Sequence, residues 1–102
     1  MGEIEISSSA FSYTILLKTG QKDTEAQKAS LQYMLSKLRE ALDNYIRNDG
    51  TLRKSLRGMK SPYFEISSVD DGGFDDVIYV LTLREGKYGK GPKTYTIRAP
   101  AS

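Results

Sequence analysis

The segment from Asp23 to Arg47 constrains the fold of this chain more than any other part of the sequence. Apolar side chains recur there three or four residues apart, and they are Leu31, Leu35, Leu38, Leu42 and Tyr45, with Met34 and Ile46 widening the stripe. This spacing places them on one face of an α-helix. Every other apolar run alternates or is short, as strands do. We therefore predict an α+β fold in which one long amphipathic helix packs across a four- or five-stranded, mainly antiparallel sheet, in the order β-α-β-β-β.

Polar residues mark both ends of the predicted helix. Thr24 is the expected N-cap, and Gln27 stands where its capping-box partner belongs. Residues 48–50 (Asn-Asp-Gly) form the expected stop, at which Gly50 takes a positive φ. Beyond this stop, a short second helical segment is predicted by the spacing of Leu52, Leu56 and Met59.

Alternating runs predict strands on both sides of the helix. Residues 3–7 and 11–17 form either two strands or one strand with a bulge at the serines between them. An antiparallel meander is expected at the other end of the chain, from residues 63–69, 77–83 and 94–98, with a turn at 70–73 and a tail from Ala99. Because Val77–Leu81 is apolar on both sides, we predict that it is the central strand.

The missing residue types exclude most hydrolase chemistry and leave only carboxylate, lysine or tyrosine chemistry. The chain has 102 residues, which suits a single globular domain spanning 1–102, and it contains neither Cys nor His. This composition excludes a disulfide framework, a thiol nucleophile, the usual zinc sites and a histidine-dependent triad. We therefore expect a protein that is not an enzyme and that has no cofactor.

The N-terminal residues and the hydropathy pattern bear on location. The start of the chain is acidic and alternating, unlike a signal peptide. No apolar run approaches the roughly 18 residues that a membrane span requires. We expect a protein without a membrane partner, located in the cytoplasm or incorporated in a virion.

Charge is segregated along the chain, although the formal net charge is only +2. Residues 37–60 hold seven cations against three anions, and residues 84–98 hold five cations against one anion. Residues 61–83, between these blocks, contain no cation and these acidic residues: Glu65, Asp70, Asp71, Asp75 and Asp76.

The two basic blocks contain the candidate binding residues. The glycine-rich loop within residues 84–98 predicts a basic hairpin tip that can grip a nucleic-acid backbone without reading its sequence, or else a lysine-rich turn that keeps the sheet soluble. Residues 53–60 predict a short helix with cations on one side and leucines on the other. The anion-binding candidates are Arg53, Lys54, Arg57, Lys60, Lys87, Tyr88, Lys90 and Lys93.

The nine residues from Gly50 to Gly58, Gly-Thr-Leu-Arg-Lys-Ser-Leu-Arg-Gly, support a second interpretation. This stretch resembles the Thr-Gly-x-Leu-Arg-x-Ser-Ile segment that follows the long helix in some tail-completion and head-to-tail joining proteins of tailed phages. It departs from that pattern at Asp49-Gly50-Thr51, which replaces the Thr-Gly pair. The resemblance implies a viral structural or assembly protein that works by self-association.

Two further clusters have both a functional and a structural interpretation. The aspartates at 70, 71, 75 and 76 can ligate Mg²⁺ or Ca²⁺, pair with a basic copy of the chain, or simply suit a hairpin turn. We expect no metal there. Tyr63 and Tyr95, assigned to neighbouring strands, are candidates for stacking on bases, although packing explains most tyrosines of this kind.

These observations favour a non-enzymatic binding module that contacts an anionic partner, either nucleic acid or an acidic protein surface. The runner-up is a phage or viral assembly protein, with a homo-oligomer as its working form. A viral inhibitor of a host nucleic-acid complex shares both profiles. A small enzyme that uses metal-assisted chemistry on the aspartates comes last.

Overall fold

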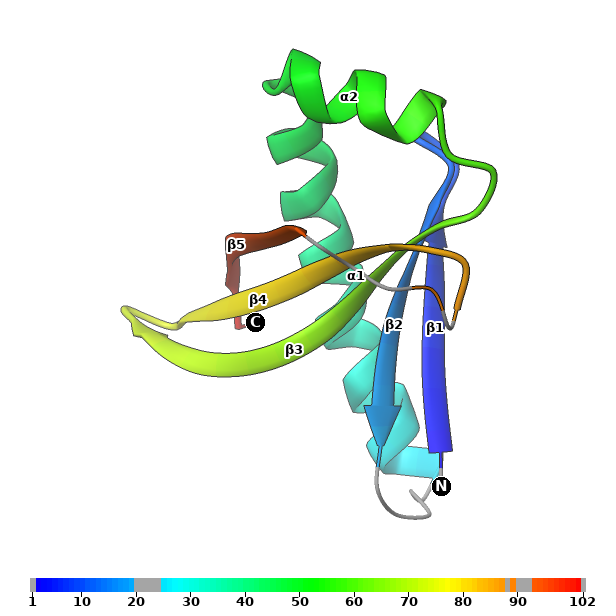
Figure 1. The fold of residues 1–102 in the computed structure, drawn as a ribbon. Coiled ribbons are helices and arrows are strands. Elements are labelled where there is room, and N and C mark those ends of the chain that lie inside the picture. The colour runs from blue at the N-terminus through cyan, green and yellow to red at the C-terminus, as the bar shows by residue number, and fades with distance from the viewer. Residues whose placement is uncertain (1, 20–24, 88, 90–92, 102) are drawn as a thin grey trace.

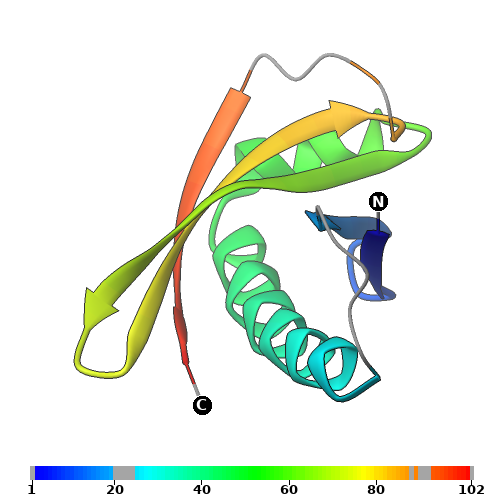
Figure 2. The same cartoon turned by 90° about the horizontal axis from the view of Figure 1, so that it is seen from below.

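The fold is a five-stranded sheet with two helices (Figures 1 and 2), and the computed structural model describes residues 2–19, 25–87, 89 and 93–101. The elements in chain order are β1 (Gly2–Ser8), β2 (Tyr13–Thr19), α1 (Glu25–Arg47), α2 (Gly50–Arg57), β3 (Pro62–Gly73), β4 (Asp76–Glu85) and β5 (Lys93–Pro100). The predicted α+β class is confirmed, with a short second helix and with two strands before α1.

The strands lie in the order β1-β2-β3-β4-β5. Three of the four neighbouring pairs are antiparallel, but β2 and β3 run parallel, with Ile15 opposite Phe64. A parallel pair needs a crossover connection, and here that connection contains both helices. The antiparallel meander of β3, β4 and β5 is confirmed. The strand that contains Val77–Leu81 is β4, which is bonded on both sides, but the crossover puts β3 in the middle of the sheet.

The N-terminal strands form a hairpin and are not one bulged strand. Ser8 pairs with Tyr13, and the turn between them contains Phe11, which the alternation had wrongly assigned to a strand. Ser12 in this turn has a φ of 54°, which no strand residue adopts. The hairpin therefore places Phe11 at one end of the sheet, where its half-buried side chain packs against the core.

Helix α1 lies across one face of the sheet (Figure 2), and its predicted apolar stripe faces the sheet. Its fully buried side chains are Leu35, Leu38, Leu42 and Ile46. Tyr45 was expected in the stripe, but it lies at the rim and its side chain is exposed. Ile46 takes the buried position because it continues the four-residue spacing from Leu42. The predicted N-cap, Thr24, lies outside the described residues.

The break between α1 and α2 differs in detail from the prediction. Asp49 is the N-cap of α2, and its carboxylate accepts a hydrogen bond from the Leu52 N–H at 3.0 Å. Gly50 is therefore the first residue of a helix, and its φ is not positive. The carbonyls at the end of α1 are capped by Arg53, whose guanidinium donates to the carbonyls of Ile46 and Arg47.

The C-terminal strands are longer than predicted. β3 continues through the aspartates to Gly73, and the turn is formed by Phe74 and Asp75, not by residues 70–73. Gly73 pairs with Asp76, and the register shifts between Asp71 and Gly73. The expected tail is also wrong at its start, because Ala99 belongs to β5 and is buried.

A hydrogen-bonded cluster joins the N-terminal hairpin to α1. The hydroxyls of Tyr13 and Ser8 both donate to Oδ1 of Asp43, at 2.6 Å and 2.9 Å. Tyr13 is buried, and its burial and the hydrogen bond to Asp43 raise its pKa above the usual value of tyrosine. The cluster therefore holds Tyr13 protonated in the folded state.

Tyr13→Phe should lower stability at pH 7 by about 2 kcal/mol, because it removes a hydrogen bond to a charged group. It should also make stability less sensitive to alkaline pH. Above about pH 10 the unfolded chain loses a proton from Tyr13 that the folded chain keeps, so stability falls as pH rises. Urea denaturation at pH 8 and pH 11 checks both effects, with the exposed Tyr33→Phe as control. An equal alkaline loss in wild type and Tyr13→Phe would contradict this account.

Candidate anion-binding surface

Helix α2 is amphipathic and presents cations to solvent. Leu52 and Leu56 are buried against the core, while Lys54 and Arg57 are exposed on the other side of the helix. Lys60 follows in the connection to β3 and is also exposed. No described acidic side chain forms an ion pair with Lys54, Arg57 or Lys60. The predicted arrangement of cations and leucines is confirmed.

A groove lies between α2 and the turn of the N-terminal hairpin. Its volume is about 390 Å³, and we call it the basic groove. It is lined by Ala10, Phe11, Ser12, Arg53, Leu56, Arg57, Met59 and Lys60. None of these described lining residues is acidic, so the groove combines positive charge with apolar lining residues. Such a combination suits an anionic group that carries a ring or another apolar part.

The structure brings together three of the predicted residues here, namely Arg53, Arg57 and Lys60. Sequence reasoning missed Phe11, because alternation assigned it to a strand. The guanidinium of Arg47 lies over the Phe11 ring, 5.9 Å from its centroid, which adds a further cation near the groove. The serine run before Phe11, a turn signal, was the feature that could have identified it.

The other predicted residues are placed differently. Lys54 and Lys93 line a second groove of about 430 Å³ between α2 and the ends of β4 and β5. Glu85 also lines this groove, so its charge is mixed, although the Glu85 carboxylate accepts a hydrogen bond from the Ser61 N–H at 2.7 Å. Tyr88 and Lys90 lie outside the described residues.

The sequence predicted that Lys87 projects from a hairpin tip, but its side chain is instead paired with glutamates. Its Nζ lies 3.0 Å from a Glu3 carboxylate oxygen and 3.9 Å from one of Glu5. Both glutamates belong to β1, so the side chain of Lys87 lies against that strand. Gly86 has a φ of 78°, and a Cβ on Gly89 would collide with the Glu85 carbonyl. Both glycines therefore serve the turn itself.

Other cations of the 84–98 block are also paired. Arg84 lies 2.9 Å from Glu65, which is also 3.7 Å from Lys18. Arg98 lies 3.2 Å from Asp76. Carboxylates thus neutralise Arg84, Lys87 and Arg98 in this block, whereas the exposed cations of α2 have no described carboxylate partner.

Tyr63 and Tyr95 do not form a stacking surface together. They lie on β3 and β5, which are separated by β4, so they were wrongly assigned to neighbouring strands. Tyr95 faces α1, where its ring meets Tyr45 and Phe64 edge-on, at 6.2 Å and 6.1 Å. Tyr63 precedes the core residue Phe64 and therefore faces the opposite side of the sheet.

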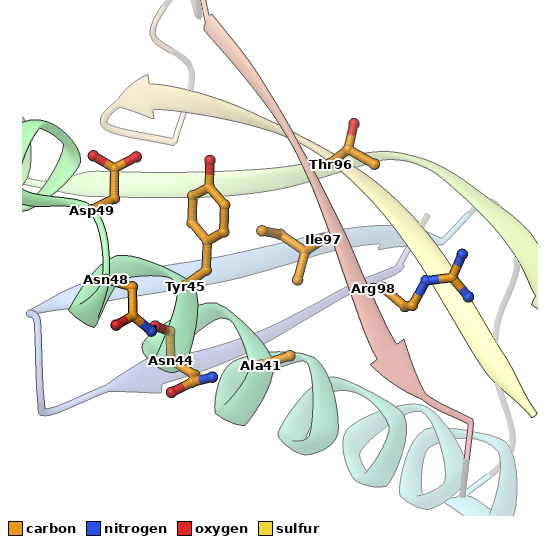
Figure 3. A pocket seen from close by; sticks show the side chains of 8 residues that line it. All are labelled: Ala41, Asn44, Tyr45, Asn48, Asp49, Thr96, Ile97 and Arg98. Carbon is orange, nitrogen blue, oxygen red and sulfur yellow. The ribbon is translucent and has the colours of Figure 1, made fainter.

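A third hollow, of about 400 Å³, lies between the end of α1 and β5 (Figure 3). Its polar residues are mostly engaged: the Asn48 amide donates to the Asn44 carbonyl at 2.9 Å, and Asp49 caps α2. Figure 3 shows the Arg98 side chain turned away from Tyr45 and Asp49. We find no converging reactive groups among the residues that line this hollow.

The aspartates of the β3–β4 turn do not gather as metal ligands. In the described part of the chain, no three acidic side chains come together in a way that could hold a metal ion. Asp71 instead accepts a hydrogen bond from the Gly73 N–H at 2.9 Å. The expectation of no bound metal stays a prediction.

No family model, curated protein or solved structure matches this chain. Within the described residues, neither helix is long and apolar enough to cross a membrane. The basic groove and the charges around it are therefore the features of the molecule that bear on its function.

Proposed function

We propose that this protein is a non-enzymatic binding module that holds single-stranded nucleic acid in the basic groove. The observation that carries the proposal is the groove lining, in which Arg57 and Lys60 have no described acidic partner and Phe11 lies nearby. Cations gain affinity for phosphates by releasing counterions, and an aromatic ring can stack on an unpaired base. Neither contact requires a particular base, so we propose binding without sequence preference.

The distribution of charge favours α2 over the loop after β4 as the main contact. Lys87 and Arg84 already face glutamates, so a phosphate would have to compete with those carboxylates. Arg53 lines the groove but also caps α1, so we assign it a positioning role as well as a contact. Lys54 and Lys93 lie on the far side of α2 and can extend the path of the backbone.

The groove lining also supports a function other than catalysis. The chain has no Cys or His, and none of the described lining residues is a carboxylate. The groove therefore lacks the usual general bases and the thiol nucleophile.

Arg57→Gln with Lys60→Gln should weaken binding of a labelled single-stranded oligonucleotide of about 16 nucleotides by at least about tenfold at 50 mM salt. The slope of log affinity against log salt should become shallower by roughly 0.7 for each phosphate that the variant no longer neutralises. Fluorescence anisotropy over a salt series measures both quantities. Stability should hardly change, because both side chains are exposed.

Lys28→Gln with Lys37→Gln is the matched control, because it removes the same net charge from α1. This control should bind within about twofold of wild type if the contact is local. Two results would overturn the proposal: no binding by wild type at low salt, or equal losses in both double variants. The latter would mean that binding follows net charge and not the groove.

A further inference from the structure

Phe74 is a fully exposed aromatic side chain at the end of the β3–β4 hairpin. It forms a two-residue turn with Asp75, and their φ angles are 52° and 62°. Two positive φ angles are the pattern of a type I′ turn, in which Asn and Gly are the usual residues. A phenylalanine in this conformation costs stability and leaves its ring in water. Folding therefore gives no reason for an aromatic residue at this position.

Three carboxylates lie on the same hairpin as the exposed ring. Asp70, Asp71 and Asp75 are exposed, and none of them forms an ion pair with a cation in the described parts of the chain. Val69 on the same hairpin is 46% exposed and adds apolar surface. We call residues 69–76 the acidic tip. It carries exposed apolar side chains and carboxylates without a described cationic partner on one hairpin.

The acidic tip is held in place by β5. Arg98 donates a hydrogen bond to the Gly72 carbonyl at 2.7 Å, and the Ala101 N–H donates to the Asp75 carbonyl at 2.7 Å. Phe74 is thus presented on a supported hairpin, and binding requires little further ordering of the backbone.

The basic groove is the complement of this tip in both charge and polarity. Its half-buried apolar residues Phe11 and Met59 can contact a phenyl ring, and its cations can face the aspartates. A volume of about 390 Å³ has room for the ring. In Figure 1 the β3–β4 turn lies on the other side of the molecule from the β1–β2 turn, which borders the basic groove, so a tip cannot reach the groove of its own chain.

We infer that the acidic tip of one copy of this chain docks in the basic groove of a second copy, with Phe74 as the anchor. The two surfaces differ, so the contact is head-to-tail and produces a ring or an open chain of copies. This inference goes beyond the proposed function, because it adds the acidic tip, a surface that nucleic acid does not contact, as a second ligand of the same basic groove. A contact of this small size is weak and sensitive to salt.

The first test removes the tip without disturbing the fold. Phe74→Asn, Asp70→Asn and Asp75→Asn are combined, since Asn tolerates a positive φ. In about 50 mM salt the wild-type mass measured by light scattering should rise with concentration, and it should fall to that of the monomer at about 0.5 M salt. The tip variant should stay monomeric where wild type assembles. The control Tyr33→Asn with Glu25→Gln and Glu40→Gln, which removes an exposed aromatic ring and two carboxylates elsewhere, should assemble like wild type.

The second test mixes two defective variants. Arg57→Asp with Lys60→Asp disables the groove and leaves the tip intact, so it should also be monomeric alone. Mixed in equal amounts with the tip variant, it should form a one-to-one dimer and nothing larger, because the pair has one working tip and one working groove. Melting curves of both variants check that each is folded.

Three outcomes would overturn the inference. They are a wild type that stays monomeric up to about 1 mM, a folded tip variant that assembles like wild type, and a mixture in which no dimer forms. Because the tip variant keeps its groove, its oligonucleotide affinity should equal that of wild type at concentrations at which wild type is monomeric. Nucleic-acid binding and assembly can therefore fail separately.

Discussion

Leu38→Asp should abolish the cooperative unfolding transition of this protein. Leu38 is fully buried where α1 crosses the sheet. A carboxylate at that point would have no partner in an apolar core, which costs more than about 4 kcal/mol. A domain of this size has only about 5–15 kcal/mol of stability in total. Circular dichroism on heating and the dispersion of amide NMR signals measure the loss.

Gln32→Asp is the control for this substitution, because it places the same side chain on the exposed side of the same helix. It should change stability by a few tenths of a kcal/mol, through helix propensity alone. A cooperative melt near that of wild type for Leu38→Asp would show that the apolar stripe of α1 does not face a core.

Phe64→Ala should destabilise the domain by about 3–5 kcal/mol. Phe64 is fully buried on β3, the middle strand, and its ring meets Tyr13 edge-on at 5.3 Å and Tyr95 at 6.1 Å. Truncation of Phe64 leaves a cavity beside the parallel strands β2 and β3, between the rings of Tyr13 and Tyr95. Urea denaturation at pH 7 measures the change in free energy of unfolding.

Phe74→Ala provides the matched comparison, because it makes the same truncation at a fully exposed side chain. It should cost little or nothing in stability. If both truncations had similar effects, the core would not be centred on Phe64. Together the two variants separate a phenylalanine that folds the protein from one that is free to bind a partner.

The predictions from sequence succeeded where a short pattern decides the structure. The three- and four-residue spacing of leucines identified α1 and most of its buried face, and Leu52 and Leu56 identified α2. Alternation identified the strands of the meander, although their ends differed by a few residues. Tyr45 was misplaced because a side chain at the edge of a helical stripe can lie on either side of the boundary.

The candidate site was predictable only in part. The cations of α2 follow from the amphipathic pattern of residues 50–57, and the structure brings Arg57 and Lys60 to one groove. The other wall of that groove comes from Phe11, more than forty residues earlier in the chain. No local pattern connects these two segments. The pairing of Lys87 with Glu3 was equally hidden, because the two residues are more than eighty positions apart and meet only in the folded sheet.

The sequence by itself determined the α+β class, the long helix, the amphipathic second helix and the segregation of charge, because each depends on residues within a few positions of one another. The tertiary structure alone decided that β2 pairs in parallel with β3 and on which faces Tyr63 and Tyr95 lie. It also decided that Lys87 pairs with glutamates of β1 and that the Phe74 side chain is exposed. The physical reason is register. A strand reverses its faces with each residue, so a bulge or a shifted turn changes which side chains meet, and only the assembled sheet settles that alignment.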